Sequence, residues 1–297
     1  MPKILIVAPN WIGDTLLAQP LFARLHKKLS GVVIDALAPS WTAPVLRRMP
    51  EIGEVIDAPF GHGELKLGAR WRLGRALRTR GYDEAIVLPN TFKSALIPFF
   101  AEIPLRAGFV GESRYGLLNL THKLDEKRMP LMVERYAQLA EKPGTPPARP
   151  LPEVRLRVDE ANLLITLSRL ALSRAKPVVA FCPGAEYGPA KRWPARHFAA
   201  LARKLAAQGR AIWLFGSEKD REIGDEIARS SEGAATNLCG KTDLASAIDL
   251  LSLAEVVVSN DSGLMHVAAA VGSPVVALYG SSSSEHTPPL ARGFRRC

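Results

Sequence analysis

Short runs of aliphatic residues alternate along the chain with longer segments in which apolar residues recur every three or four positions. The short runs are bounded by Gly, Pro, Asn or Asp, as is typical of strands buried on both faces of a parallel sheet. The longer segments are typical of amphipathic helices. The pattern predicts strands at residues 3–8, 32–37, 55–56, 84–88, 106–109, 177–182, 211–215, 256–258 and 275–279.

Helical patterns fall between these predicted strands. They cover residues 15–29, 43–49, 64–80, 90–101, 162–173, 194–208, 219–230, 244–253 and 264–271. Pro20 lies inside the first of them and is expected to kink it. Strands that alternate with helices in this way predict an α/β fold with doubly wound parallel sheets.

A proline-rich segment separates two such series. Residues 142–152, K-P-G-T-P-P-A-R-P-L-P, read as a linker because proline and glycine interrupt both helices and strands. We therefore expect a first domain at residues 1–152 and a second domain, with the same architecture, at residues 153–297.

The chain of 297 residues has a net charge of +10, of which residues 1–150 carry +7 and the remainder +3. A basic domain suits nucleic acid, an anionic lipid surface or a phosphorylated substrate. No zinc-finger spacing and no aromatic RNA-binding strand occurs, so nucleic acid is not an expected partner. An anionic membrane surface and a phosphorylated substrate remain.

The sequence also indicates a compartment. No apolar run approaches the ~18 residues of a transmembrane helix, and no secretory signal precedes the first predicted strand. Cys182, Cys239 and Cys297 are too widely spaced for a metal-ligand pattern and suggest no disulfide framework. These features predict a protein of the reducing cytoplasm.

Residues 256–270, V-V-V-S-N-D-S-G-L-M-H-V-A-A-A, read as a buried strand, a turn and the start of an apolar helix. Such a turn lies at the carboxyl end of a parallel strand, where open α/β sheets bind ligands. The N–H groups of the helix start suit a phosphate. Asp261, Ser262, Gly263 and His266 are therefore candidate ligand residues. An ordinary N-cap followed by a core histidine is the alternative, and this stretch alone does not decide between them.

The loop after the first strand, N-W-I-G-D at residues 10–14, is a second candidate. Gly13 allows a ligand to approach the backbone closely. Asp14 could be a general base or the N-cap of the next helix, and its spacing alone favours the cap. No Gly-x-Gly-x-x-Gly follows the strand, which argues against a dehydrogenase.

Two loops of the second domain carry further polar groups. Residues 181–194 contain Gly184 and the pair Lys191 and Arg192 within a long Gly- and Pro-rich connection. These cations could neutralise a diphosphate, a reading that we favour over a solvated basic pair. Residues 215–220 contain Glu218 and Asp220, which could bind a ribose diol or serve only as favourable charges at a helix start. No Asp-x-Asp, Walker A or Gly-x-Ser-x-Gly motif occurs, so neither a metal nor a cofactor is expected.

Taken together, these motifs resemble those of the ADP-heptose:lipopolysaccharide heptosyltransferases of glycosyltransferase family 9. The resemblance runs along nearly the whole chain and is carried by W-I-G-D, L-P-N-T-F-K-S-A-L-I-P-F-F (88–100), P-L-M-V-E-R-Y (130–136), C-P-G-A-E-Y-G-P-A-K-R-W-P (182–194) and N-D-S-G-L-M-H-V-A-A-A (260–270). It implies a GT-B fold, in which two Rossmann-like domains enclose an active-site cleft. It also implies an inverting transfer that needs no metal.

The resemblance assigns roles to the candidate residues. It makes Asp14 the base that takes the proton of the acceptor hydroxyl, and Lys191 a contact of the donor diphosphate. The expected donor site comprises Gly13, Gly184, Lys191, Asp261, Ser262, Gly263 and His266, with Glu218 or Asp220 on the adenosine ribose. The expected acceptor residues are Asn10, Trp11, Lys93 and Arg114.

The implied reaction moves heptose from ADP-L-glycero-D-manno-heptose to the first heptose of the lipopolysaccharide inner core, presented as heptosyl-Kdo2-lipid A. Two alternatives stay open: an enzyme that uses Kdo-lipid A as the acceptor, and a donor-binding remnant without catalysis. The second arises because residues 291–297 end the chain where family members usually continue for several tens of residues, so the second domain is expected to be incomplete.

The acceptor implied by the resemblance is a membrane lipid, so we expect the enzyme at the cytoplasmic face of the inner membrane. The first domain would receive the acceptor and the second ADP-heptose. The predicted helix at residues 64–80 is the expected membrane contact, because it carries Lys66, Arg70, Arg72, Arg75, Arg78 and Arg80. A solvated basic face without a partner is the alternative.

Overall fold

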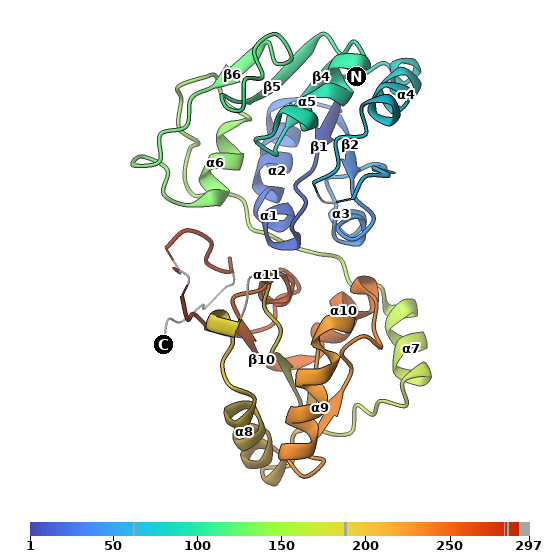
Figure 1. The fold of residues 1–297 in the computed structure, drawn as a ribbon, viewed down its shortest axis with the longest axis vertical. Helices are drawn as coiled ribbons and strands as arrows, with labels where there is room; N and C mark the ends of the chain where they lie inside the picture. The colour runs from blue at the N-terminus through green and yellow to red at the C-terminus, as the bar shows by residue number, and fades with distance from the viewer. Residues whose placement is uncertain (62, 187–188, 282, 284, 291–297) are drawn as a thin grey trace. The chain divides into compact units, whose positions relative to one another are not determined.

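The computed structural model describes residues 1–61, 63–186, 189–281, 283 and 285–290. The chain divides into two compact units, Met1–Glu153 and Val154–Cys297. Each unit is built on one parallel β-sheet with helices packed against it (Figure 1). The predicted α/β class, with two doubly wound sheets, is confirmed.

The sheet of the first unit has the strand order β3-β2-β1-β4-β5-β6, and all neighbouring strands are parallel. Its strands are β1 (Lys3–Val7), β2 (Val33–Ala38), β3 (Val55–Asp57), β4 (Glu84–Val87), β5 (Leu105–Phe109) and β6 (Leu120–His122). In β1, Val7 lies opposite Leu37 on one side and Val87 on the other. Strand order therefore reverses at β1, and the loop that follows β1 lies at the switch point where such sheets bind ligands.

The helices of the first unit form two groups. In the first group, α1 (Ile12–Leu17), α2 (Gln19–Lys28), α3 (Ala43–Arg47) and α6 (Met132–Gln138) pack side by side. In the second group, α4 (Leu67–Leu77) and α5 (Phe92–Phe100) pack on each other, with a 3-10 turn, Arg78–Arg80, after α4. Leu5 and Val7 of β1 join the core under α4 and α5, as expected for alternate positions of one strand.

Gly74 allows α4 and α5 to approach each other closely. A Cβ atom at position 74 would lie 2.6 Å from Cβ of Phe100 and 2.8 Å from the carbonyl oxygen of Ile97. Both distances are far below van der Waals contact, so the two helices touch there through backbone atoms.

The second unit has a sheet with the order β11-β10-β7-β8-β9, again parallel throughout. Its strands are β7 (Val178–Cys182), β8 (Ala211–Leu214), β9 (Ala235–Asn237), β10 (Ala254–Asn260) and β11 (Val275–Leu278). The helices are α7 (Glu160–Arg169), α8 (Ala195–Ala207), α9 (Arg221–Ser230), α10 (Leu244–Leu251) and α11 (Gly263–Ala270), with 3-10 turns at Pro189–Lys191 and Glu218–Asp220.

The structure corrects two predicted helices of the first unit. The segment expected as one kinked helix at 15–29 is two helices separated at Ala18, because Pro20 occupies the first turn of α2 and cannot donate within a continuous helix. The helix expected at 64–80 begins at Leu67, since Lys66 adopts a left-handed backbone conformation with φ of 40°.

Two further sequence features can be compared with the structure. Cys182 and Cys239 are buried free thiols. Cys297 and the expected chain-end departure at 291–297 lie outside the described residues. Within the ranges that the structure describes, no helix is long and apolar enough to span a membrane.

Candidate active site

The loop between β1 and α1 in the first unit is held by hydrogen bonds to its backbone. The indole Nε1 of Trp41 donates to the carbonyl oxygen of Asn10 at 2.8 Å. The hydroxyl of Thr15 donates to the carbonyl oxygen of Trp11 at 2.9 Å. The two bonds fix the direction in which the chain enters α1, and Trp41 is a supporting residue that the sequence pattern did not reveal.

Asp14 is the third residue of α1, so the prediction that it caps this helix is wrong. The N-cap is Trp11, and Asp14 lies inside the first turn, where the helix dipole favours a carboxylate. Its side chain is partly exposed, and the sequence candidate Gly13 lies beside it in the same turn.

Tyr136 of α6 lies within electrostatic reach of Asp14. Helix α6 packs on α1, and burial raises the pKa of Tyr136 well above its ordinary value, with the negative charge of Asp14 adding to the rise. The Tyr136 hydroxyl therefore stays protonated. Tyr136 is the last residue of the motif P-L-M-V-E-R-Y, but the motif alone could not show that it lies near Asp14.

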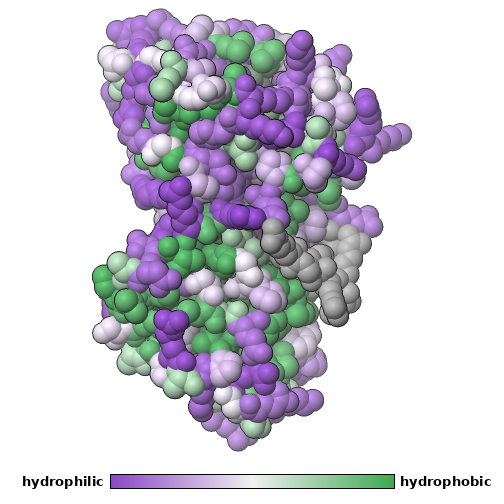
Figure 2. All heavy atoms as spheres, turned by 180° about the vertical axis from the view of Figure 1, so that it is seen from behind, coloured by the Kyte–Doolittle hydropathy of each residue, from purple (hydrophilic) through white to green (hydrophobic). Residues whose placement is uncertain are grey.

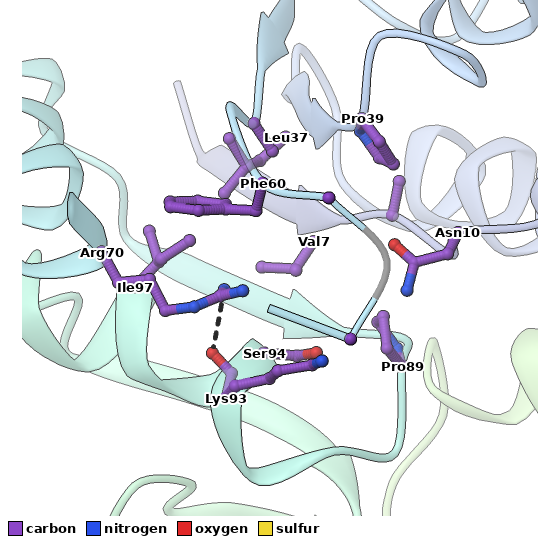
Figure 3. A pocket seen from close by; sticks show the side chains of 14 residues that line it. Val7, Asn10, Leu37, Pro39, Phe60, Arg70, Pro89, Lys93, Ser94 and Ile97 are labelled. Atoms are coloured by element: carbon purple, nitrogen blue, oxygen red, sulfur yellow. Dashed lines mark hydrogen bonds between the residues drawn. The ribbon is translucent and has the colours of Figure 1, made fainter. Parts of the chain in front are cut away.

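A pocket of about 50 Å³ opens at the carboxyl edge of the first sheet (Figure 3). Asn10 and Lys93, two of the expected acceptor residues, line it together with Arg70 and the ring of Phe60. Figure 3 shows the Arg70 guanidinium between this ring and the carbonyl oxygen of Lys93.

Arg70 is not available as a surface cation, which corrects its expected role in a membrane contact. Only 6% of the residue is exposed, and its guanidinium donates to the carbonyl oxygens of Leu65 at 2.6 Å, Glu64 at 3.0 Å and Lys93 at 3.2 Å. Two other cations of the predicted helix are also engaged, since Arg78 pairs with Glu102 and Arg80 with Glu54.

Arg114, the fourth expected acceptor residue, is likewise turned into the protein. It is buried and donates to the carbonyl oxygens of Pro89 at 2.9 Å and Gly111 at 3.3 Å, and also to Phe109 and to the side chain of Asn90. With these acceptors, its guanidinium joins the loop after β5 to the loop after β4. This geometry assigns Arg114 to holding the loops and not to presenting a charge.

The second unit brings Lys191 and Asp261 together. Nζ of Lys191 lies 3.0 Å from Oδ2 of Asp261, and both side chains are largely buried. Lys191 is the last residue of the 3-10 turn in the loop between β7 and α8, whereas Asp261 directly follows β10 and precedes the N-cap of α11. The neighbouring order β10-β7 in the sheet places the two loops side by side.

Asn260 joins the same two loops and was not among the sequence candidates. Its Oδ1 accepts from the backbone N–H of Trp193 at 3.0 Å, and its Nδ2 donates to the carbonyl oxygen of Pro183 at 2.7 Å. Both ends of the loop 183–193 are therefore attached to the end of β10. Residues 187–188 in this loop lie outside the described residues.

The start of α11 offers backbone donors. Ser262 occupies the N-cap position, as the capping alternative expected, but its side chain makes no capping hydrogen bond to the helix. Gly263 is the first helical residue. His266 is buried, and burial lowers its pKa to about 4, although the charge of Asp261 opposes this shift. The imidazole is therefore neutral near pH 7.

Glu218 and Asp220 have structural partners of their own. Oδ2 of Asp220 accepts from the N–H and the hydroxyl of Ser217 at 2.9 and 2.7 Å, which closes a capping box. Gly184 lies against this carboxyl group, because a Cβ there would be 2.5 Å from Cγ of Asp220. Glu218 pairs with Arg221 at 2.5 Å and remains largely exposed. Of the two, Glu218 is the freer to bind a ligand.

The candidate residues thus gather at the carboxyl edge of each sheet. Asn10, Trp11, Gly13, Asp14 and Lys93 belong to the first unit, while Gly184, Lys191, Asp261, Ser262, Gly263 and His266 belong to the second. In the described parts of the chain, no three His, Cys, Asp or Glu side chains are grouped so that they could hold a metal ion.

The chain is similar to known heptosyltransferases over almost its whole length. The pattern of glycosyltransferase family 9 (heptosyltransferase) matches residues 70–296. Lipopolysaccharide heptosyltransferase 2 of Salmonella typhimurium is 50% identical, over 99% of this chain and 87% of the relative, and its Escherichia coli K12 counterpart is 49% identical over the same shares.

Solved structures agree with these relatives. The structure of E. coli ADP-heptose lps heptosyltransferase II has a TM-score of 0.92 and 45% identity, covering 99% of this chain and 90% of the solved one. An E. coli heptosyltransferase structure with ADP, at 22% identity and a TM-score of 0.77, shares the fold over 97% of this chain and 91% of the solved one. The two parallel sheets, the motifs at their carboxyl edges and these similarities show that the chain belongs to glycosyltransferase family 9, the heptosyltransferases.

Proposed function

We propose that this glycosyltransferase moves heptose from ADP-heptose to the first heptose of the lipopolysaccharide inner core. The names of the most similar relatives support this reaction. The observation that carries it is the pair Lys191 and Asp261 next to the start of α11, where no side chain caps the helix. A cation together with the backbone N–H groups of a helix start suits the diphosphate of a nucleotide sugar.

In the proposed reaction, the acceptor hydroxyl oxygen attacks the anomeric carbon of the donor heptose. Asp14 accepts the hydroxyl proton as the new C–O bond forms. The bond from the anomeric carbon to the diphosphate breaks at the same time, and ADP leaves with its electron pair. A single displacement of this kind inverts the configuration at the anomeric carbon.

The second unit supplies the groups that receive the leaving diphosphate. Lys191 and the N–H groups at Gly263 stabilise its developing charge, in place of a metal ion. Glu218 would bind the adenosine ribose, since Asp220 is already occupied as a cap. His266 lies in the same helix start, but it is buried and neutral near pH 7, so Lys191 and the N–H groups carry the electrostatic stabilisation in this proposal.

The first unit supplies the acceptor side. Asn10, Trp11 and Lys93 lie at the edge of its sheet, and Asn10 and Lys93 line the pocket of Figure 3. The charge excess of residues 1–150 supports association of this unit with an anionic membrane surface at the cytoplasmic face of the inner membrane.

The test is incubation with ADP-heptose and each of two acceptors, heptosyl-Kdo2-lipid A and Kdo2-lipid A, followed by mass analysis of the lipid. Addition of one heptose to the first acceptor and not to the second supports the proposal. Addition only to the Kdo-terminated acceptor would assign the chain to the other acceptor class. Donor binding, measured by calorimetry with ADP-heptose, without product on either acceptor would indicate a non-catalytic donor-binding protein.

A further inference from the structure

Three large apolar side chains are exposed at the corner where the loop after β3 enters α4. Leu65, Leu67 and Trp71 are 51%, 52% and 51% exposed. Leu67 and Trp71 are four residues apart in α4, so they lie on the same side of the helix, and Leu65 precedes them directly. A concentration of apolar side chains at one exposed corner indicates a surface that is covered by a partner. We refer to residues 65–75 as the α4 corner.

Cations surround these apolar side chains. Lys66, Arg72 and Arg75 are exposed, and the Arg75 guanidinium lies 5.8 Å from the centre of the Trp71 ring. The α4 corner contains no acidic residue. Figure 2 shows one face of the molecule, on which hydrophilic and hydrophobic residues are interspersed. Leucine, tryptophan and basic side chains together at one exposed corner match the layers of a bilayer surface, where tryptophan lies at headgroup level and cations bind anionic lipid.

The α4 corner is held in place from inside the protein. The buried Arg70 guanidinium lies over the Phe60 ring at 4.1 Å and donates to the carbonyl oxygens of Glu64 and Leu65. Lys66 is fixed further by its pairing with Glu64 at 2.8 Å. Because the backbone is anchored, the exposed side chains are presented without the entropy loss of ordering a flexible loop on binding.

The corner also adjoins the pocket of Figure 3, since Arg70 belongs to both. We propose that Leu65, Leu67 and Trp71 insert into the interfacial layer of an anionic bilayer, while Arg72 and Arg75 bind its headgroups. This contact deepens the membrane association of the proposed function by naming the residues that make it. It would bring a lipid-borne acceptor close to the pocket entrance.

The experiment measures co-sedimentation of the full chain with vesicles of phosphatidylglycerol and phosphatidylcholine at low and high salt. One variant removes the apolar groups (Leu65→Ser, Leu67→Ser, Trp71→Ser), and another removes the charges (Arg72→Gln, Arg75→Gln). Matched controls remove exposed apolar residues of α7 (Leu164→Ser, Ile165→Ser) or exposed cations elsewhere (Lys204→Gln, Arg229→Gln). Circular dichroism checks the fold of each variant, and transfer to a delipidated core oligosaccharide checks activity independently of any membrane.

We expect the charge variant to lose roughly 25-fold in partitioning at low salt, since each of the two interfacial cations contributes about fivefold. The apolar variant should lose roughly tenfold or more at either salt concentration, and both controls should bind like the parent. Bromine-labelled lipid should quench tryptophan fluorescence of the parent more than that of Trp71→Phe. Equal binding by parent and both corner variants would overturn the proposal. So would sedimentation without lipid that is lost in the apolar variant, because it would identify a second copy of the chain as the occupant. Retained activity on the delipidated acceptor separates either failure from failure of the proposed function.

Discussion

Lys191 and Asp261 form an ion pair of 3.0 Å between residues that are seventy positions apart in the chain. The pair gives the lysine a fixed direction before any ligand is present. It also places a carboxylate where a diphosphate is proposed to bind, so the lysine must balance the charge of both groups. This arrangement leads to the first prediction.

Replacing Lys191 by Ala should weaken ADP binding by roughly 10–100-fold, as expected for a lost hydrogen bond to a charged group. The double variant Lys191→Ala, Asp261→Asn should recover part of the loss, because the carboxylate would no longer repel the diphosphate. Isothermal calorimetry with ADP measures both effects. Lys204→Ala is the matched control, since Lys204 is exposed on α8 of the same unit. An unchanged affinity in Lys191→Ala would remove this lysine from the donor site.

Asp14→Asn should lower kcat by roughly 10²–10⁴-fold, because the amide keeps the shape of the carboxylate but cannot accept the proton. ADP affinity should stay at the parental value, since Lys191 and Asp261 lie in the second unit. Steady-state kinetics with the lipid acceptor and calorimetry with ADP provide the two measurements. Asp57→Asn removes another carboxylate at the end of a strand in the same sheet and should leave kcat unchanged. Near-parental turnover of Asp14→Asn would refute its assignment as the base.

Chelation with EDTA should leave the transfer rate unchanged if Lys191 and the N–H groups at Gly263 stabilise the leaving diphosphate. The measurement compares initial rates before and after EDTA and again after addition of Mg²⁺ or Mn²⁺. A loss of activity that either metal restores would mean that a cation, and not Lys191, carries the diphosphate charge.

Arg114→Met should destabilise the first unit, because it leaves the buried carbonyl oxygen of Phe109 without this donor and also removes the bonds to the less buried Pro89 and Asn90. A buried acceptor costs about 1–3 kcal/mol when it is left unsatisfied. Urea unfolding measures the change, with the exposed Arg128→Met as control. A parental unfolding free energy combined with a raised KM for the acceptor would instead return Arg114 to the acceptor site.

His266 should make stability depend on pH. Burial lowers its pKa in the folded state to about 4 from an ordinary value of 6.5, so between these values the unfolded chain binds a proton that the folded chain does not. Stability should therefore fall as the pH decreases from 6.5 to 4, by about 3 kcal/mol at most. His266→Gln should flatten this dependence, whereas the exposed His26→Gln should not. Some slope should persist in His266→Gln, since burial also lowers the pKa of His122. Chemical unfolding at several pH values tests the prediction, and identical slopes for His266→Gln and the parent would contradict it.

The sequence alone predicted those strands and helices whose amino-acid composition indicates that they are buried. Runs such as residues 256–258 could be read as strands because they are short, consist of β-branched residues and are followed by turn residues. The edge strands β6 (Leu120–His122) and β9 (Ala235–Asn237) were missed, since each has only three residues and includes polar ones. Edge strands have a partner on one side only and carry a weaker apolar signal.

The position of a candidate residue could be predicted where its motif follows a strand, as for the segments that contain Asp14, Lys191 and Asp261, while the role of each residue stays a prediction. The position could not be predicted where a side chain acts across the fold. Arg70 and Arg114 are basic residues in the sequence, and only the structure shows them buried against carbonyl oxygens. The supporting roles of Asn260 and Trp41 could not be predicted either, because their hydrogen-bond partners are tens of residues away in the chain.

Gly74 limits how far the sequence of α4 can vary. Any other residue there would place an atom 2.6 Å from Cβ of Phe100 and force α4 away from α5. A library that randomises residues 65–75, selected only for folded protein, should therefore return glycine at position 74 and many different residues at positions 71, 72 and 75. The two sides of this short helix would then tolerate different substitutions. Packing against α5 restricts the inner side, whereas the surface that α4 contacts restricts the outer side.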